Sequence, residues 1–342
     1  SRQRIPTYSA AMVASSARLR QHWQHGACLD IDREMTHLTL AITCKTLFDA
    51  DIEAEAQEAG AAITTVLKMF PRFMLPFNQL LARLPLPSNR RAAQARARLE
   101  AIMYRIIQER RAHNVDMGDL LSMLLAARDH EGDGQGMSDQ QLRDEIMTIF
   151  LAGHETTAAL LTWTWYLLAQ HPLQEAQLHA ELDTVLKGRP PTFDDVPQLV
   201  YTRMVLAEAM RLYPPAWIIG RRAIEPYAVG GYELPAKTIV LVSPYLIQHD
   251  ARFYPAPEVF DPQRWTPEAE AGRPKFAYFP FGGGARQCIG EGFAWMESML
   301  ILATLAQQWQ MRLVPGHQVA LQPLITLRPK YGMRMILTRR AA

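Results

Sequence analysis

One stretch near the C-terminal end carries the strongest signal in the chain: Phe279-Pro-Phe-Gly-Gly-Gly-Ala-Arg-Gln-Cys-Ile-Gly-Glu-Gly-Phe293. Its three consecutive glycines can adopt positive φ and let the backbone approach a neighbouring group closely. Cys288 precedes an apolar segment of helical character, residues 293–309, and a helix N-terminus favours a thiolate and lowers the thiol pKa. Arg286 adds a permanent cation with a forked geometry that suits a carboxylate. The stretch therefore predicts a loop that holds one thiolate.

Other functions of a glycine-rich loop fit this stretch less well. A phosphate-binding P-loop needs a Lys-Ser/Thr pair, and none follows Gly284. A dinucleotide loop needs a glycine where this chain has Gln287. An isolated cysteine in a tight turn is most simply a small buried residue. A thiolate beside a carboxylate-bearing cofactor, in contrast, describes thiolate-ligated haem.

Five residues of the stretch resemble the haem-binding signature of the cytochrome P450 monooxygenases, Phe-x-x-Gly-x-Arg-x-Cys-x-Gly: Phe281, Gly284, Arg286, Cys288 and Gly290. The resemblance implies haem b as the cofactor. It implies that Cys288 is the axial ligand of the iron and that Arg286 pairs with a haem propionate. It also implies that the neighbouring loop residues contact the haem: Pro280, Phe281, Gly282, Ile289 and Gly290.

The composition limits the possible partners and location. The 342 residues are 49% hydrophobic and carry a net charge of +2, so nothing attracts the chain strongly to nucleic acid. Three cysteines, Cys28, Cys44 and Cys288, are too few for a disulfide framework and suit a reducing compartment, so we expect a cytoplasmic protein. We also expect a monomer. The longest apolar runs, residues 158–169 and 296–306, are shorter than the about 20 residues that span a bilayer.

Helical periodicity dominates the chain, with short β-like runs toward the C-terminus. The predicted fold is mainly α with small β-sheets, and the resemblance makes it a cytochrome P450 fold of bacterial type, N-terminally incomplete, with a long central helix over the haem. We expect one domain over residues 1–342. Its parts are a helical core at about 1–225 and 290–309, a cysteine loop at 279–292, and small β and meander regions at 226–280 and 310–340. The predicted helices are 5–25, 30–48, 52–69, 89–113, 117–128, 138–170, 172–186, 200–212 and 293–309.

The long central helix is predicted from its boundaries. Ser138 and Gln141 form a capping box, and no proline interrupts the pattern before His171-Pro172. At 1.5 Å per residue this helix is roughly 50 Å long. Gly153 lies in its middle among polar residues, at a cost of about 1 kcal/mol relative to alanine. Local inconsistency of this kind is typical of functional sites.

The centre of this helix also contains a histidine next to a glutamate. A zinc-protease helix would place a second histidine at Ala158, so that reading is excluded. The stretch Ala152-Gly153-x-Glu155-Thr156 is instead similar to the oxygen-activation motif of cytochrome P450s. In that family Gly153 would make room for dioxygen, and Glu155 and Thr156 would relay the protons that break the O–O bond. The alternative is that both polar side chains bond back to the helix or face solvent.

The same resemblance assigns further residues to the haem and the substrate cavity. Ala152 and Gly153 would contact the haem, and Phe150 and Leu151 would contact substrate. The apolar run Pro214-Pro-Ala-Trp-Ile-Ile219 cannot be helical at its start. The family implies that this run passes over the haem and that two segments line the cavity through Ala216, Trp217, Ile218 and Ile325.

Charged residues outside the loop complete the predicted set. Arg221 would be a second propionate partner, with Arg222 as the runner-up. Glu208 and Arg211 share one helix face, a spacing that alone indicates a solvated pair worth about 0.3 kcal/mol. In the family these two residues would interlock with Arg264 beneath the cysteine loop, in a structural role.

The resemblance implies a haem-thiolate monooxygenase that inserts one oxygen atom of O2 into an apolar organic substrate, such as a fatty acid, terpenoid or carotenoid-like molecule. The sequence contains no flavin or nicotinamide motif, so we expect electrons from a ferredoxin or flavodoxin-type donor with its reductase. A peroxide-driven peroxygenase is an alternative. A non-catalytic haem-binding protein is another, because family members begin with an additional N-terminal region that this sequence does not contain.

Overall fold

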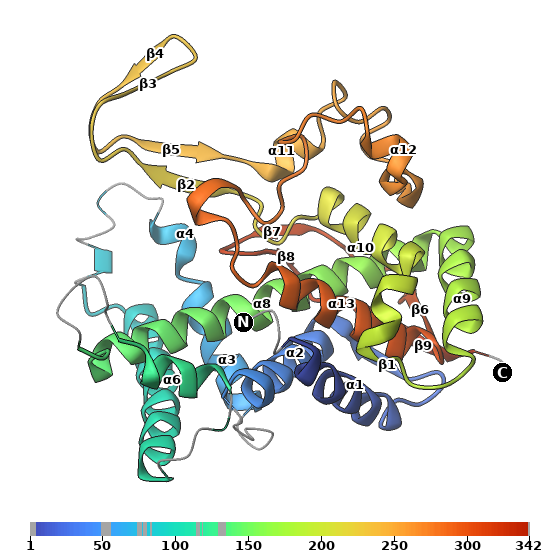
Figure 1. The fold of residues 1–342 in the computed structure, drawn as a ribbon, viewed down its shortest axis with the longest axis horizontal. Helices are drawn as coiled ribbons and strands as arrows, with labels where there is room; N and C mark the ends of the chain where they lie inside the picture. The colour runs from blue at the N-terminus through green and yellow to red at the C-terminus, as the bar shows by residue number, and fades with distance from the viewer. Residues whose placement is uncertain are drawn as a thin grey trace.

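The computed structural model describes residues 5–48, 56–73, 77, 81–82, 84–113, 117, 119–128 and 135–340 (Figure 1). Most of them are helical, in agreement with the predicted fold class. The helices are α1 Ile5–Gln21, α2 Ile31–Phe48, α3 Ala56–Leu67, α4 Phe70–Phe73, α6 Pro87–His113, α7 Leu120–Ala126, α8 Asp139–Gln170, α9 Pro172–Leu186, α10 Val200–Leu212, α11 Pro244–Gln248, α12 Pro267–Glu270 and α13 Glu291–Ala306.

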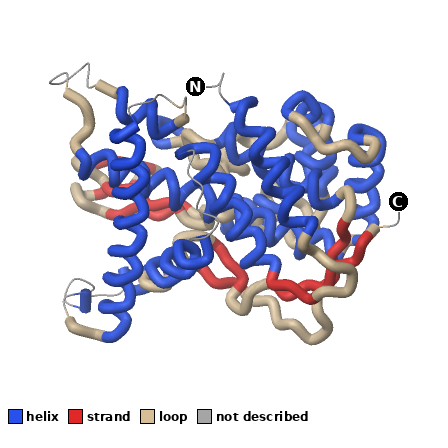
Figure 2. The backbone as a smooth tube through the Cα atoms, turned by 90° about the horizontal axis from the view of Figure 1, so that it is seen from below, coloured by secondary structure: helices blue, strands red, loops and turns tan. Residues whose placement is uncertain are grey.

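The strands form small antiparallel groups among and beside the helices (Figure 2). A three-stranded sheet of order β1-β9-β6 joins the beginning of the chain to its end, with Cys28 opposite Ile336. The pairs β2–β5 and β3–β4 extend away from the helical body, and β7–β8 lies close to α8 and α13 (Figure 1). The strands are β1 Cys28–Asp30, β2 Ile219–Arg222, β3 Tyr227–Val229, β4 Tyr232–Leu234, β5 Ile239–Val242, β6 Trp309–Leu313, β7 Leu321–Pro323, β8 Leu327–Pro329 and β9 Arg334–Arg339.

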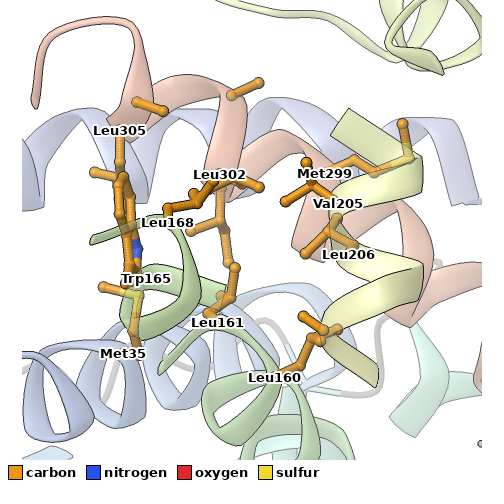
Figure 3. Close-up of a cluster of buried hydrophobic side chains, with 14 of the residues drawn as sticks. Met35, Leu160, Leu161, Trp165, Leu168, Val205, Leu206, Met299, Leu302 and Leu305 are labelled. Atoms are coloured by element: carbon orange, nitrogen blue, oxygen red, sulfur yellow. The ribbon is translucent and has the colours of Figure 1, made fainter. Parts of the chain in front are cut away.

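The central helix α8 crosses the molecule beside α2, α10 and α13 (Figure 1). Its capping box is formed, because the Gln141 amide donates to Ser138 Oγ at 3.3 Å and the Ser138 amide donates to Gln141 Oε1 at 2.9 Å. A helix that is apolar on all sides must be buried on all sides, and the C-terminal half of α8 meets this condition. Figure 3 shows side chains of the four helices meeting in one core, among them Met35, Trp165 and Leu302.

A second core lies around the N-terminal half of α8, where α2, α3, α6 and α7 pack together. Cys44 is buried in it, as expected for a cysteine with a packing role. The two cores hold α8 along its whole length. The centre of α8, between them, is therefore a rigid platform for the residues of the predicted motif.

Several predicted boundaries differ from the structure by a few residues, and two differences have a clear physical cause. The first helix ends at Gln21 instead of residue 25, because the chain turns there, with Gly26 at φ +80°, into the unpredicted strand β1. Residues 70–87 contain four prolines, which a helix interior does not tolerate, so the sequence predicts a connecting loop there. In the structure this stretch begins with the single helical turn α4, whose proline lies in the first turn, where a helix tolerates it. Most of residues 74–83 lie outside the described residues.

Candidate functional site

The cysteine loop depends on its three glycines. Gly282 and Gly284 have φ of +73° and +71°, in the left-handed region that side chains with a Cβ avoid. Gly283 is extended, but a Cβ there would lie 2.8 Å from the Phe276 ring. Each glycine is therefore required, two for backbone conformation and one for a close approach.

The loop presents the thiol of Cys288. The Cys288 amide donates to the Phe281 carbonyl at 2.9 Å and closes the loop across the glycines. The Gly290 amide donates to the sulfur and lowers its pKa. Desolvation is the larger effect, and together with the nearby Glu291 carboxylate it raises the pKa of the thiol above its usual value. The lowering of the thiol pKa that the sequence predicts is therefore not found, because the cost of burial outweighs the Gly290 amide and the Glu291 carboxylate in the first turn of α13 adds to it.

The surroundings of the thiol fit a haem group. Arg286 and Arg221 are both exposed, and neither pairs with a carboxylate among the described residues; the Arg221 guanidinium donates to the Gly220 carbonyl at 2.9 Å. The side chain of Ile289, next to Cys288, is 96% exposed. A free thiol, two guanidiniums without carboxylate partners and an uncovered aliphatic side chain match the iron, the propionates and the apolar ring of haem. Within the loop, Pro280 is buried and Phe281 packs against Trp295 with ring centroids 6.0 Å apart.

The middle of α8 has one uncovered face. Ala152 is exposed and Thr156 partly exposed, whereas residues 157–165 are all buried. These two residues are four apart and so share a helix face. The Thr156 hydroxyl donates to the Ala152 carbonyl at 2.8 Å, which is the back-bonded arrangement that the sequence left open. Leu151, beside this face, is partly buried.

Two residues predicted at the cavity pack elsewhere. A Cβ on Gly153 would point at α2, 3.4 Å from Thr43 Cγ2 and 3.9 Å from Leu47 Cδ1, and α8 continues through this position without interruption. The Cβ position of Gly153 therefore lies at ordinary contact distance from α2, and the expected room for dioxygen does not lie there. Phe150 is fully buried in the second core and offers no surface to a ligand, which corrects its assignment as a substrate contact.

Glu155 is buried, 3% exposed, and its partners come from β8 and the turn before it. The Thr326 hydroxyl donates to Glu155 Oε1 at 2.8 Å, and Arg328 Nε lies 3.4 Å from the same oxygen. His154 Nε2 is 3.8 Å from Glu155 Oε2, too far for a hydrogen bond. Burial lowers the pKa of His154, so this ring is neutral near pH 7. The carboxylate is thus held by β8, on a different side of α8 from the open face.

A second carboxylate shares the cation of Glu155. Arg328 Nη2 lies 3.3 Å from Asp32 Oδ1 and donates to the Thr36 hydroxyl at 2.6 Å. Burial raises the pKa of Asp32 to about 6, although the guanidinium opposes this shift. Sequence reasoning missed Thr326, Arg328 and Asp32, because Thr326 is 171 residues from Glu155 and no local pattern connects them.

The two predicted substrate segments lie together. Trp217 Nε1 donates to the Leu324 carbonyl at 2.9 Å, and the Leu327 amide donates to the Pro215 carbonyl at 3.0 Å. These bonds tie the run after α10 to the β7–β8 turn. Ile325, at the tip of that turn, is 50% exposed. The remaining predicted contacts are partly buried: Ala216, Trp217 and Ile218.

Glu208 and Arg211 form a fully buried ion pair instead of the solvated pair that their spacing alone indicates. Arg211 donates to both Glu208 oxygens at 2.8 Å. Arg264 Nε lies 3.4 Å from Glu208 Oε1, and Trp265 Nε1 donates to Oε2 at 2.9 Å. The structure therefore brings together the three charged residues that the resemblance grouped.

The family model described as Cytochrome P450 matches residues 4–333. This chain belongs to the cytochrome P450 family. Cytochrome P450s bind haem b, so the predicted cofactor and the haem-dependent monooxygenase class are confirmed. No described helix of this cytochrome P450 has the length and apolar character to cross a membrane.

Relatives of this cytochrome P450 support the assignment. It is 42% identical to "Cyclooctatin synthase" of Streptomyces melanosporofaciens, over 95% of this chain and 71% of the relative. It is 40% identical to "Cyclooctat-9-en-7-ol 5-monooxygenase" of the same organism, over 92% of this chain and 68% of the relative. The solved structure "Retinoic acid bound cyanobacterial CYP120A1" aligns with a TM-score of 0.88 and 28% identity, covering 99% of this chain and 76% of that structure.

Proposed function

We propose that this cytochrome P450 inserts one oxygen atom of O2 into an apolar substrate of the terpenoid type, with two electrons from a separate ferredoxin or flavodoxin-type donor and its reductase. The observation that carries the proposal is the exposed free thiol of Cys288 together with the exposed guanidiniums of Arg286 and Arg221, which pair with no carboxylate among the described residues. The overall reaction also consumes two protons and releases one water molecule. We place the enzyme in the cytoplasm, consistent with three cysteines of which none forms a disulfide, and we propose that it is a monomer.

The cysteine loop supplies the haem contacts in this proposal. The Cys288 sulfur would ligate the iron, with the Gly290 amide stabilising its negative charge. Arg286 and Arg221 would each pair with a propionate. When bound, the haem supplies the redox-active iron for dioxygen activation, and a thiolate ligand increases the electron density that favours O–O cleavage. Binding also removes Ile289 from water.

Two residues of α8 would supply protons. The Thr156 hydroxyl lies on the partly open face of the helix, where it can give up its bond to the Ala152 carbonyl and donate to an oxygen nearby. Glu155 is buried next to it and would hold and pass on the proton that Thr156 delivers. General acids placed in this way typically contribute about 10²–10⁴-fold to a rate.

The substrate class is proposed from the cavity segments and the relatives. Ala216, Trp217, Ile218 and the half-exposed Ile325 offer apolar contacts and no charge. The name of one relative denotes an unsaturated alcohol as its substrate. An apolar cavity with few hydrogen-bonding groups favours a compact hydrocarbon or alcohol over a strongly charged molecule.

The decisive experiment is the absorption spectrum of the reduced, CO-bound protein. We expect the strongly red-shifted Soret band of thiolate-ligated haem in the wild type and in Cys28→Ala, whose thiol is also exposed. The band should be lost in Cys288→Ala. An unchanged band in Cys288→Ala would overturn the assignment of the iron ligand.

Turnover assays then separate the catalytic alternatives. Terpenoid alcohols and hydrocarbons, fatty acids and carotenoids are each supplied with ferredoxin, reductase and NADPH, and separately with hydrogen peroxide alone. Hydroxylated terpenoid product that needs the electron donor supports the proposal. Turnover with peroxide alone would identify a peroxygenase, and a thiolate-type spectrum without product under either supply would identify a non-catalytic haem protein.

A further inference from the structure

We propose that Arg328 is a positioning residue for Glu155, and that Asp32 controls how firmly Arg328 holds it by competing for the same guanidinium. This inference rests on the proposed proton-delivery role of Glu155. Two residues that are far apart in the sequence, Asp32 at the start of α2 and Arg328 on β8, would thus control the position of the Glu155 carboxylate on α8.

Arg328 is within ion-pair distance of two carboxylates. Its side chain is 8% exposed, its Nε lies 3.4 Å from Glu155 Oε1 and its Nη2 lies 3.3 Å from Asp32 Oδ1. Its only donated hydrogen bond among the described residues goes to the Thr36 hydroxyl at 2.6 Å. Both carboxylates therefore lie within ion-pair distance of the guanidinium, and neither has the paired, parallel bonds of a saturated arginine–carboxylate contact.

The cluster also contains buried polar atoms that no described group satisfies. They are Asp32 Oδ1, Glu155 Oε2, His154 Nε2 and Arg328 Nε. Unpaired buried polar atoms are costly, at about 1–3 kcal/mol each, so several in contact indicate that the network is not restricted to one arrangement. A small movement of the guanidinium can complete its bonds to either carboxylate.

The charge of Asp32 determines which carboxylate the Arg328 guanidinium pairs with. The groups that face this cluster are Asp30 of β1, Asp32 of α2, His154 and Glu155 of α8, and Arg328 of β8. His154 is neutral because burial lowers its pKa. When Asp32 takes up a proton, Glu155 is the other carboxylate within 4 Å of Arg328 among the described residues. The pKa of Asp32, raised to about 6 by burial, places this change in a range accessible to experiment.

Arg328 also connects the carboxylate to the substrate cavity. Ile325, Thr326 and Arg328 belong to one segment, and Trp163 of α8 fixes that segment by donating to the Leu327 carbonyl at 2.8 Å. Thr326 donates to Glu155, and Ile325 at the tip is exposed. A contact with substrate at the tip can therefore alter the position of the groups that hold Glu155.

The experiment uses haem-loaded enzyme and compares Asp32→Asn, Arg328→Lys and Arg328→Gln with the wild type at pH values that extend below the ordinary pKa of Asp32, 3.8, and above its raised value of about 6. A matched control is Asp183→Asn on the outer helix α9. This change also removes a carboxylate next to an arginine, because Asp183 lies 2.7 Å from Arg340. Two quantities are measured: coupling, as product formed per NADPH consumed, and the thermal unfolding midpoint. The second quantity does not depend on turnover.

In the wild type we expect coupling to change as the pH passes about 6, where Asp32 titrates. Asp32→Asn should keep the low-pH value of the wild type at each pH. Arg328→Lys keeps the charge but not the guanidinium geometry and should reduce coupling about tenfold. Because the folded-state pKa of Asp32 is raised, the wild-type unfolding midpoint should fall as pH rises from about 4 to 6, and Asp32→Asn should lack this component.

Coupling and unfolding curves of Asp32→Asn that follow the wild type and Asp183→Asn at every pH would overturn the inference. If Arg328→Gln fails to fold, Arg328→Lys and Asp32→Asn decide the outcome. Glu155→Gln tests the proposed role of Glu155 separately from the positioning role of Arg328 and Asp32. If Glu155→Gln is fully coupled, the proposed role of Glu155 is wrong; if it is impaired while Asp32→Asn and Arg328→Lys match the wild type, only the positioning role is wrong.

Discussion

Glu208 and Glu155 are both buried glutamates that face an arginine, yet their surroundings differ. Each oxygen of Glu208 accepts bonds, from Arg211, from Trp265 and from the amide of Asp261. Glu155 accepts one bond from a threonine, and its second oxygen has no partner among the described groups. One site is saturated with donors and the other is not.

The difference separates a structural carboxylate from one that is available for chemistry. A saturated carboxylate is held as an anion in one position, because any movement breaks several charge-assisted bonds. An unsaturated carboxylate can rotate and exchange protons. Glu297 of α13 is a third case: it is fully buried, faces the Thr157 hydroxyl, and burial raises its pKa to about 8. The glutamates of this cytochrome P450 thus differ according to the cations and donors around them.

The largest expected effect is at the saturated site. Arg211→Met leaves Glu208 buried without its main partner, and breaking such a pair costs about 3–5 kcal/mol of the free energy of unfolding. Chemical denaturation of the haem-loaded protein measures this loss. Arg252→Met, in an exposed pair with Asp250, is the control and should stay close to the wild type. Equal losses in both variants would show that burial of the pair is unimportant.

A smaller effect on the free energy of unfolding is expected at Glu297, which forms no ion pair with an arginine among the described residues. The pKa of Glu297 is about 8 in the folded state against 4.5 unfolded, so the native state binds the proton more tightly and stability falls as pH rises between these values. Glu297→Gln is neutral at every pH and should exceed the wild type by about 3 kcal/mol at about pH 7, with the difference shrinking as the pH falls toward 4.5. Stability curves that remain parallel across this range would argue against a protonated Glu297.

Glu155→Gln tests the unsaturated site directly. Because glutamine cannot pass on a proton, turnover should fall about 10²-fold, equivalent to about 2.7 kcal/mol, while the unfolding midpoint stays near that of the wild type. Glu100→Gln on α6, whose partners are the exposed Arg96 and the largely buried Arg143, serves as the control. A large loss of stability with normal turnover would instead assign Glu155 the role that Glu208 has.

The smallest effect concerns the glycine two residues before Glu155. Gly153→Ala adds a Cβ at ordinary contact distance from Thr43 and removes the helix penalty of glycine, so stability should rise by up to about 1 kcal/mol. Coupling of NADPH to product should not change. Loss of coupling without a gain in stability would restore the predicted role of Gly153 beside dioxygen.

Residues with local requirements were predicted well. The three loop glycines meet local steric demands, and the capping box of α8 is made by residues three apart, so both are visible in the sequence. Phe150 and Gly153 were assigned to the cavity from their place in a motif, but the side of α8 on which they lie is decided by the packing of α2 and α6. The back-bonded Thr156 hydroxyl likewise depends on what surrounds the helix.

The sequence alone determined the thiol-bearing loop, the boundaries of most helices and the membership of the cytochrome P450 family, because these follow from residue types at short, fixed spacings. The tertiary structure decided which groups face Glu155, why Asp32 titrates near pH 6 and why the thiol pKa of Cys288 is raised. Those properties arise from burial and from charges on segments far apart in the chain. No local pattern encodes them, because electrostatic environment is a property of packed neighbours.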